Sequence, residues 1–183
     1  MVAGKRLPLQ RRDRPGLAPE FPHRSPVWIV RRESSIGVVR AIAVDLDEVL
    51  ADTHPVWRDW LVDAARRARV ELSSLPDDRV AAAAVLDERL GDWRPLLERF
   101  AADRGPLHFR PRSEVSAALR RLSSAGARIG AFTDAPRELA DIALAHAGAA
   151  RRVDVVGTLE DVQRELGANA VVVRSRAELL GLA

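Results

Sequence analysis

Two aspartates two residues apart, Asp45 and Asp47, are the side chains of this chain best suited to chemistry. They follow an apolar run that ends at Val44, so they stand where a buried strand would emerge from a sheet. One carboxylate at such a place can attack an electrophile while its neighbour carries the proton of the leaving group. A solvated turn or a helix cap is the alternative for an Asp-x-Asp pair taken alone. The pair therefore needs partners before it indicates a reaction.

A hydroxyl and a further carboxylate follow a second apolar run, at Thr133 and Asp134. Because the carboxyl ends of parallel strands meet at one edge of a sheet, we expect these residues to face the same crevice as Asp45 and Asp47. Two carboxylates opposite a hydroxyl suit the covalent transfer of a phosphoryl group. The sequence therefore predicts an active site at this edge.

The segments that must position these residues have the sequence pattern of an α/β domain. Apolar, β-rich runs alternate with amphipathic helical segments of about 8 to 15 residues. This alternation favours a doubly wound parallel sheet with helices on both faces. The predicted strands lie at 38–44, 127–133, 153–156 and 170–173.

Residues 55–105 show helical periodicity and no strand pattern. Within this stretch Ser74 and Gly91 are signals for the start and the end of a second helix. We predict a small helical cap inserted after the first strand. The predicted boundaries are 55–105 for the cap, and 38–54 with 106–183 for the core.

The amino-terminal residues 1–37 are rich in proline and arginine and lack an apolar period, so we expect a disordered, dispensable tail. A start of translation at Val38 or Val39 is an open hypothesis. Residues 1–40 carry nine basic and three acidic side chains, a net charge of +6, whereas the whole chain carries +3. The remainder is therefore mildly acidic, and we expect no nucleic-acid partner.

The chain has no cysteine, so it can form neither a disulfide nor a thiolate metal site. No apolar run approaches the roughly 20 residues that cross a bilayer, and no signal-peptide pattern begins the chain. We therefore expect a cytoplasmic protein without a membrane partner. The sequence leaves the oligomeric state open.

The residues around the aspartate pair resemble a known motif. The run Ala41–Thr53 is similar to the first motif of the haloacid-dehalogenase-like superfamily, an apolar strand followed by Asp-x-Asp-x-Thr/Val. The segment Arg112–Pro136 resembles the helix, glycine and strand that lead to the second motif of that family, a Ser or Thr, here Thr133. The resemblance covers about residues 38–175. It implies a Rossmann-like core with a helical cap at the place of the predicted insert.

The resemblance also implies roles for single residues. Asp45 would be the nucleophile that becomes an aspartyl-phosphate, Asp47 the general acid and then base, and Thr133 a hydrogen-bond donor to the phosphoryl oxygens. One Mg²⁺ would be held by the Asp45 carboxylate, by the backbone carbonyl of Asp47 and by an acid from a later motif. Backbone N–H groups that bind the substrate would be those of Leu46, Asp134 and Ala135.

The later motifs of this chain depart from the family pattern. The only lysine is Lys5, so an arginine must serve in the third motif. We favour Arg152, which precedes the third predicted strand. The other arginines considered are Arg137, Arg151 and Arg164.

The fourth motif lacks its acids. After the strand at 170–173 the chain continues with Arg174 and Ser175, where the family has carboxylates. Ser175 and Glu178 have the spacing of a helix capping box, so we assign Glu178 a structural role. We expect Mg²⁺ to bind weakly, in the millimolar range, because one anionic ligand is missing.

Residues next to the aspartate pair receive structural interpretations. Asp52 and Thr53 are expected to cap the following helix, although they could line the entrance of the cap. The four histidines show no ligand spacing, so His54, which lies near the predicted site, is expected at the surface or at a hinge. Trp57 and Trp60, at helical spacing, are expected in the core of the cap.

Two functional hypotheses follow. The first is a Mg²⁺-dependent phosphatase acting on a small phosphorylated metabolite. A nucleoside monophosphate is a candidate substrate, because the Asp45–Thr53 string also looks like the first motifs of bacterial nucleotidases. The second is a catalytically weak or inactive relative that binds a metabolite or a partner protein, which the missing acid and lysine favour. The intact Asp45, Asp47 and Thr133 favour the enzyme.

Overall fold

The structure is a computed structural model that describes residues 40–69 and 71–183. The expectations about the tail 1–37 lie outside these residues. The strands are β1 (Ala41–Asp45), β2 (Arg128–Phe132), β3 (Val155–Gly157) and β4 (Val171–Val173). The helices are η1 (Leu46–Leu50), α1 (His54–Ala68), η2 (Leu72–Ser74), α2 (Arg79–Leu90), α3 (Arg94–His108), α4 (Ser113–Ser124), α5 (Arg137–His146), α6 (Leu159–Leu166) and α7 (Arg176–Leu182).

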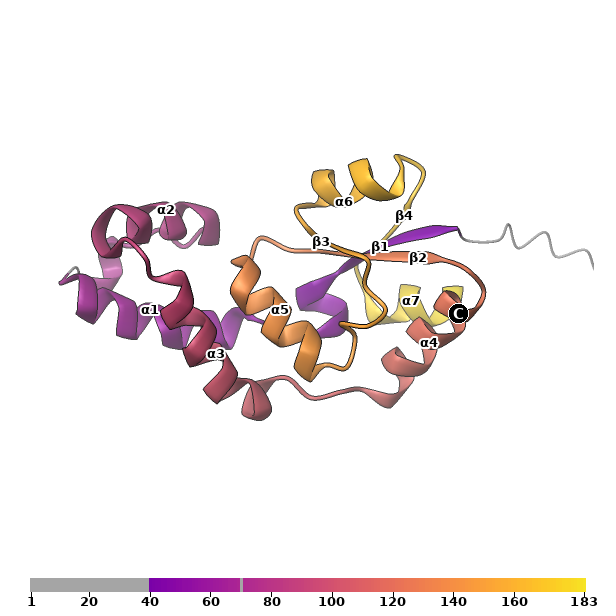
Figure 1. The fold of residues 1–183 in the computed structure, drawn as a ribbon, viewed down its shortest axis with the longest axis horizontal. Coiled ribbons are helices and arrows are strands. Elements are labelled where there is room, and N and C mark those ends of the chain that lie inside the picture. The colour runs from indigo at the N-terminus through magenta and orange to yellow at the C-terminus, as the bar shows by residue number, and fades with distance from the viewer. Residues whose placement is uncertain (1–39, 70) are drawn as a thin grey trace, which may run out of the picture. The chain divides into compact units, whose positions relative to one another are not determined.

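The four strands form one parallel sheet in the order β3-β2-β1-β4. Helix α6 covers one face of the sheet, and α4, α5 and α7 lie on the other (Figure 1). The predicted doubly wound α/β fold is therefore confirmed. Strand β1 lies in the interior of the sheet, so the residues that follow it have neighbours from β2 on one side and β4 on the other.

Alternation along the strands explains the two layers. Ile42 and Val44 are fully buried in the main core, whereas Ala43 joins a smaller cluster with Phe132 and Val162 of α6. Gly130 allows α6 to pack closely on β2, because a Cβ there would lie 2.5 Å from Cγ1 of Val162. A glycine in the strand interior is thus required by the approach of a helix.

The helices between β1 and α4 share the main core with the sheet. Trp60 stacks on Trp93 with ring centroids 6.5 Å apart, and both are buried together with Leu86 and Leu97. Helix α3 packs beside α5 (Figure 1) and continues to His108, so the predicted cap boundary at residue 105 falls inside a helix. The division into cap and core stays a prediction. None of the helices in the described ranges is long and apolar enough to cross a membrane.

The start of α2 differs from the sequence prediction. The N-cap is Asp78, whose carboxylate accepts a hydrogen bond of 2.8 Å from the backbone N–H of Ala81. Ser74 instead ends η2, with its hydroxyl donating to the carbonyl of Glu71. The predicted cap at Ser74 was wrong because an aspartate four residues later satisfies the first turn. The later start makes Arg79 the first residue of the helix.

Candidate functional site

The carboxyl ends of the four strands border one cavity of about 370 Å³, here called the first cavity. The last residue of β1 and the residues that directly follow β2, β3 and β4 all line it, as expected for the ligand site of a doubly wound sheet. The lining residues are Asp45, Asp47, Glu48, His54, Arg79, Phe132, Thr133, Asp134, Thr158, Leu159 and Arg174.

Asp45 ends β1 and caps the π-helical turn η1. Its Oδ1 accepts hydrogen bonds from the backbone N–H groups of Asp47, at 3.0 Å, and Glu48, at 3.2 Å. Its Oδ2 accepts no hydrogen bond from the residues that the structure describes. Burial raises the pKa of Asp45 above its ordinary value, the charges of Asp47 and Glu48 add to the rise, and the two N–H groups oppose it. One carboxylate oxygen is thus anchored while the other stays available for attack.

Asp47 lies deeper, and both of its carboxylate oxygens are fully engaged. Oδ1 accepts from the backbone N–H of Thr53 at 2.8 Å and from its hydroxyl at 2.5 Å. Oδ2 accepts from Nη2 of Arg79 at 2.8 Å and from the hydroxyl of Thr133 at 2.9 Å. Burial alone would raise the pKa of Asp47, but the hydrogen bonds from Arg79 and Thr53 outweigh it and lower that pKa. Asp47 is therefore held as a carboxylate.

Arg79 is the residue of this site that the sequence analysis missed. Its side chain is 5% exposed, and its guanidinium donates to Asp47, to Asp134 and, at 2.6 Å, to the hydroxyl of Thr53. Its Nε is buried without a hydrogen-bond partner in the described part of the chain. The hydrogen bonds of Arg79 therefore connect α2 to the segments that follow β1 and β2. The spacing of Arg79, Ala82 and Leu86 on one buried face of α2 is a signal that could have pointed to it, given the correct helix start.

Arg174 supplies a second guanidinium at the first cavity. It follows β4, and its guanidinium carbon lies 5.2 Å from the centroid of the Phe132 ring. The expected helix cap is present, because the Ser175 hydroxyl accepts from the backbone N–H of Glu178. The Glu178 carboxylate accepts from the backbone N–H of Arg174 at 2.8 Å and does not line the cavity. No carboxylate therefore enters the first cavity from the end of β4.

Arg152, predicted as the basic residue of the third motif, is not brought to the first cavity. Its guanidinium donates to the carbonyl of Gly148 at 3.3 Å. The physical reason is simple, since a residue that precedes a parallel strand lies at the amino edge of the sheet, opposite the site. The other arginines considered, Arg137, Arg151 and Arg164, do not line the cavity either.

Of the backbone N–H groups that were expected to bind the substrate, that of Ala135 is already engaged. The N–H of Ala135 donates to the Thr133 hydroxyl at 3.0 Å, so it serves to orient that side chain. The side chain of Asp134 is half-exposed and pairs with Arg79. The side chain of Leu46 is buried in the main core. Thr133 itself lines the cavity, as predicted from its place after β2.

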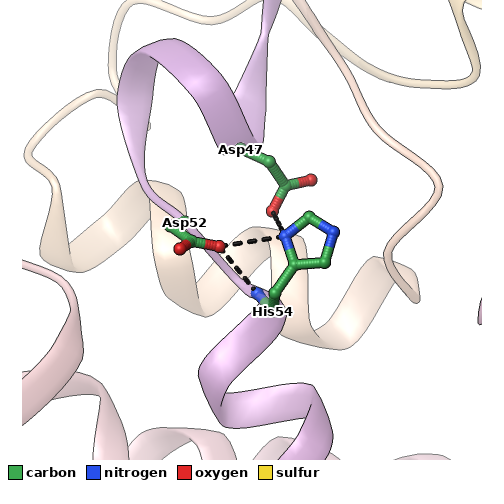
Figure 2. A group of neighbouring side chains, drawn as sticks. All are labelled: Asp47, Asp52 and His54. Atoms are coloured by element: carbon green, nitrogen blue, oxygen red, sulfur yellow. Dashed lines mark hydrogen bonds and ion pairs between the residues drawn. The ribbon is translucent and has the colours of Figure 1, made fainter.

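Figure 2 shows Asp47, Asp52 and His54, which offer one ligand atom each within 4.8 Å of one another and could hold a metal ion. The Asp52 carboxylate lies 2.9 Å from Nδ1 of His54 and accepts from the backbone N–H of His54, at the start of α1. Asp52 thus satisfies an N–H group of the first turn of α1, whereas Thr53, the other expected cap, binds Asp47. His54 was expected at the surface or a hinge, and it lines the first cavity.

The magnesium ion that the resemblance implies finds an incomplete donor set here. The four hydrogen bonds of Asp47 use the roughly four lone-pair positions of a carboxylate. Asp134 is paired with Arg79, and the residue that follows β4 is the cation Arg174. A divalent cation needs several oxygen ligands. The donor set is therefore incomplete for Mg²⁺, since only Asp45, Glu48 and the group of Asp47, Asp52 and His54 remain for it, and the two guanidiniums fit an anion better.

Comparison with known proteins identifies the family. The haloacid dehalogenase-like hydrolase family matches residues 39–173. Two similar solved structures are an L-2-haloacid dehalogenase from Xanthobacter autotrophicus with chloropropionic acid covalently bound (16% identity, 74% of this chain and 69% of that chain, TM-score 0.42) and a haloacid dehalogenase-like hydrolase from Streptococcus pneumoniae (14% identity, 75% of each chain, TM-score 0.45). No curated protein sequence matches the chain. Since the family match spans most of the sequence, the chain belongs to the haloacid dehalogenase-like hydrolases.

Proposed function

We propose that the protein hydrolyses small phosphomonoesters through an aspartyl-phosphate on Asp45. One observation carries this proposal: the Asp45 carboxylate, the Thr133 hydroxyl and two guanidiniums line the same cavity. Only one oxygen of the Asp45 carboxylate accepts hydrogen bonds. A nucleophile beside a cluster of anion-binding donors is what phosphoryl transfer requires. The substrate is a small phosphorylated molecule, and the proposal includes neither a nucleic acid nor a membrane as partner and places the protein in the cytoplasm.

The proposed reaction has two halves. In the first, Oδ2 of Asp45 bonds to phosphorus, the bond from phosphorus to the leaving-group oxygen breaks, and that oxygen takes a proton from the small fraction of Asp47 that is protonated. In the second, water attacks the phosphorus, Asp47 takes the proton back, and inorganic phosphate leaves with the Asp45 carboxylate restored. The lowered pKa of Asp47 favours the second proton transfer over the first. We therefore expect esters with acidic leaving groups, such as aryl phosphates, to react faster than alkyl phosphates.

A second cavity, of about 630 Å³, offers a place for the leaving group. It shares His54, Arg79 and Asp134 with the first cavity, so the two cavities adjoin at these residues. Its walls include apolar side chains against which a planar group packs well. These apolar residues are Trp57, Leu61, Val62, Leu75 and Pro76. A nucleoside monophosphate, with its base in the second cavity, therefore remains a candidate substrate.

Magnesium was expected as the cofactor from the family resemblance. At the first cavity only the carboxylates of Asp45 and Glu48 lack a basic partner among the described residues. No step of the proposed reaction depends on the ion, because each proton and each bond is assigned to side chains of this chain. The metal requirement is therefore a variable of the experiment and not a premise of the proposal.

The test is a panel of phosphomonoesters that includes aryl phosphates, alkyl phosphates and nucleoside monophosphates. Release of inorganic phosphate is measured with the full chain, once with Mg²⁺ and once with EDTA. We expect turnover of at least one ester, with none in the Asp45→Asn variant. If no ester is hydrolysed under either condition by folded protein, the proposal is wrong.

A binding protein without turnover is the second candidate function. The observation that favours it is the complete engagement of Asp47, whose four hydrogen bonds hold it as a carboxylate that does not readily carry a proton. Such a protein would bind phosphorylated molecules without hydrolysing them. Binding of a phosphomonoester with no release of phosphate over hours would support this alternative.

A further inference from the structure

We propose that Arg174 and Arg79 take the place of a metal ion in this site, so that the protein binds a phosphoryl group between two guanidiniums and needs no divalent cation. This inference rests on the proposed function for the identity of the ligand, a phosphoryl group.

Two of the four carboxylates that line the cavity, Asp47 and Asp134, are committed to other partners, which leaves Asp45 and Glu48 for a cation. Asp47 accepts four hydrogen bonds, one of them from Arg79. Asp134 pairs with the same guanidinium. A metal ion would have to displace the buried Arg79 guanidinium in order to reach Oδ2 of Asp47 or the paired oxygen of Asp134, and a buried charge left without its partner is strongly destabilising.

The end of β4 carries a cation at the position nearest to the nucleophile. Strand β4 pairs with β1 with Val173 opposite Val44, so Arg174 and Asp45 are the next residues along the two neighbouring strands. Arg174 lies over the Phe132 ring and lines the first cavity. In the part of the chain that the structure describes, its guanidinium pairs with no carboxylate. A guanidinium held by a ring and free of a counterion is available to a phosphoryl oxygen.

Arg79 lines the same cavity and comes from α2. Its partner Asp134 is half-exposed, so this carboxylate can turn to solvent when an anion arrives. Asp134 therefore occupies the place on the Arg79 guanidinium that a phosphoryl oxygen would take. With Arg174 and Arg79 both in contact, the phosphoryl group would be bound by charge-assisted hydrogen bonds of the kind that arginine makes with phosphate.

The experiment is calorimetric titration of the full chain with inorganic phosphate, in EDTA and in Mg²⁺. We expect the same affinity, within about twofold, in both buffers. Arg174→Gln should weaken phosphate binding about tenfold, which corresponds to the loss of one charge-assisted hydrogen bond. Asp134→Asn should strengthen it, because the competing carboxylate is removed. The matched control is Arg176→Gln, a nearby exposed arginine that does not line the cavity and should leave the affinity unchanged.

Opposite results would overturn the inference. They are phosphate binding that disappears in EDTA and returns with Mg²⁺, or equal affinity in the Arg174→Gln variant and the parent. The hydrolysis assay separates this inference from the proposed function. Turnover that requires Mg²⁺ would overturn the inference and leave the function standing, whereas EDTA-insensitive phosphate binding without turnover would leave the inference standing and overturn the function.

Discussion

The ends of β1 and β4 are neighbours in the sheet but are built in opposite ways. After β1 the chain turns through η1, and its two aspartates enter the cavity, one with a free oxygen and one inside a buried hydrogen-bond network. After β4 the serine and the glutamate serve the first turn of α7, and an arginine enters the cavity. The comparison shows that position in the fold decides which residues reach the site, whereas local helix capping decides whether a carboxylate among them is free for chemistry.

The two ends also differ in what holds them. The network at the β1 end joins Asp47 to Thr53, to Arg79 on α2 and to Thr133 after β2, so it depends on three separate segments. The interactions at the β4 end are local, within Arg174 to Glu178, apart from the contact of Arg174 with Phe132. We therefore expect substitutions at the β1 end to affect both chemistry and folding, and those at the β4 end to affect mainly ligand binding.

The largest effect is expected from Asp45→Asn. This change removes the nucleophile and should lower kcat/KM for any hydrolysed ester by about 10³-fold or more. Asparagine retains an oxygen that can accept from the N–H groups of Asp47 and Glu48, so the melting temperature should stay close to that of the parent. Steady-state kinetics together with thermal unfolding check both parts. Near-parent turnover would show that another residue is the nucleophile.

The next effect in size is on folding, from Arg79→Met. The change leaves the buried carboxylate of Asp47 without its charged partner, and we expect a loss of about 3 kcal/mol in the free energy of unfolding. Denaturant unfolding of the full chain measures it. The matched control is Arg128→Gln, which removes an exposed ion pair with Glu165 and should cost no more than about 1 kcal/mol. Adding Asp47→Asn to Arg79→Met should recover part of the loss, and no recovery would mean that Arg79 acts by packing alone.

The sequence predicted the β1 end better than the β4 end, for physical reasons. Asp45, Asp47 and Thr133 directly follow apolar strands, and the carboxyl edge of a parallel sheet collects such residues regardless of the rest of the chain. Arg152 was misplaced because a residue before a strand lies at the other edge. Arg79 was missed because its position depends on where α2 starts, and helix ends are the least certain feature of a pattern. A long-range ion pair between an insert and a strand end leaves no local signal in the sequence.

A smaller effect concerns the loss of folding stability at acid pH. The pKa of Asp47 is lowered in the folded chain from its ordinary value of 3.8, so its contribution to stability is present above that value and is lost as the pH falls through the lowered pKa. Glu178 has a lowered pKa as well, caused first by the backbone N–H of Arg174, but it is fully exposed. As the pH falls below 3.8, the ordinary value of Asp47, Asp47→Asn should flatten the fall in melting temperature, and Glu178→Gln should change it less. The reverse order would contradict the contrast between a buried network and a local cap.

The smallest expected effect comes from a substitution that narrows the second cavity. Val62 lies on α1, is 43% exposed and lines the second cavity, which touches Arg79 but not Arg174. Val62→Trp should narrow this cavity and raise the KM of esters with large leaving groups several-fold, because part of the apolar contact is lost to the new ring. Binding of inorganic phosphate, which needs only the first cavity, should not change.

The control for this change is Val80→Trp, an equally large substitution at an exposed position of α2 that lines neither cavity. It should leave both the KM values and phosphate binding as in the parent. Steady-state kinetics with a small and a large ester separates the two variants. If Val62→Trp and Val80→Trp behave alike with the large ester, the leaving group does not lie in the second cavity. The recognition of the substrate would then be confined to the first cavity, between the ends of β1 and β4.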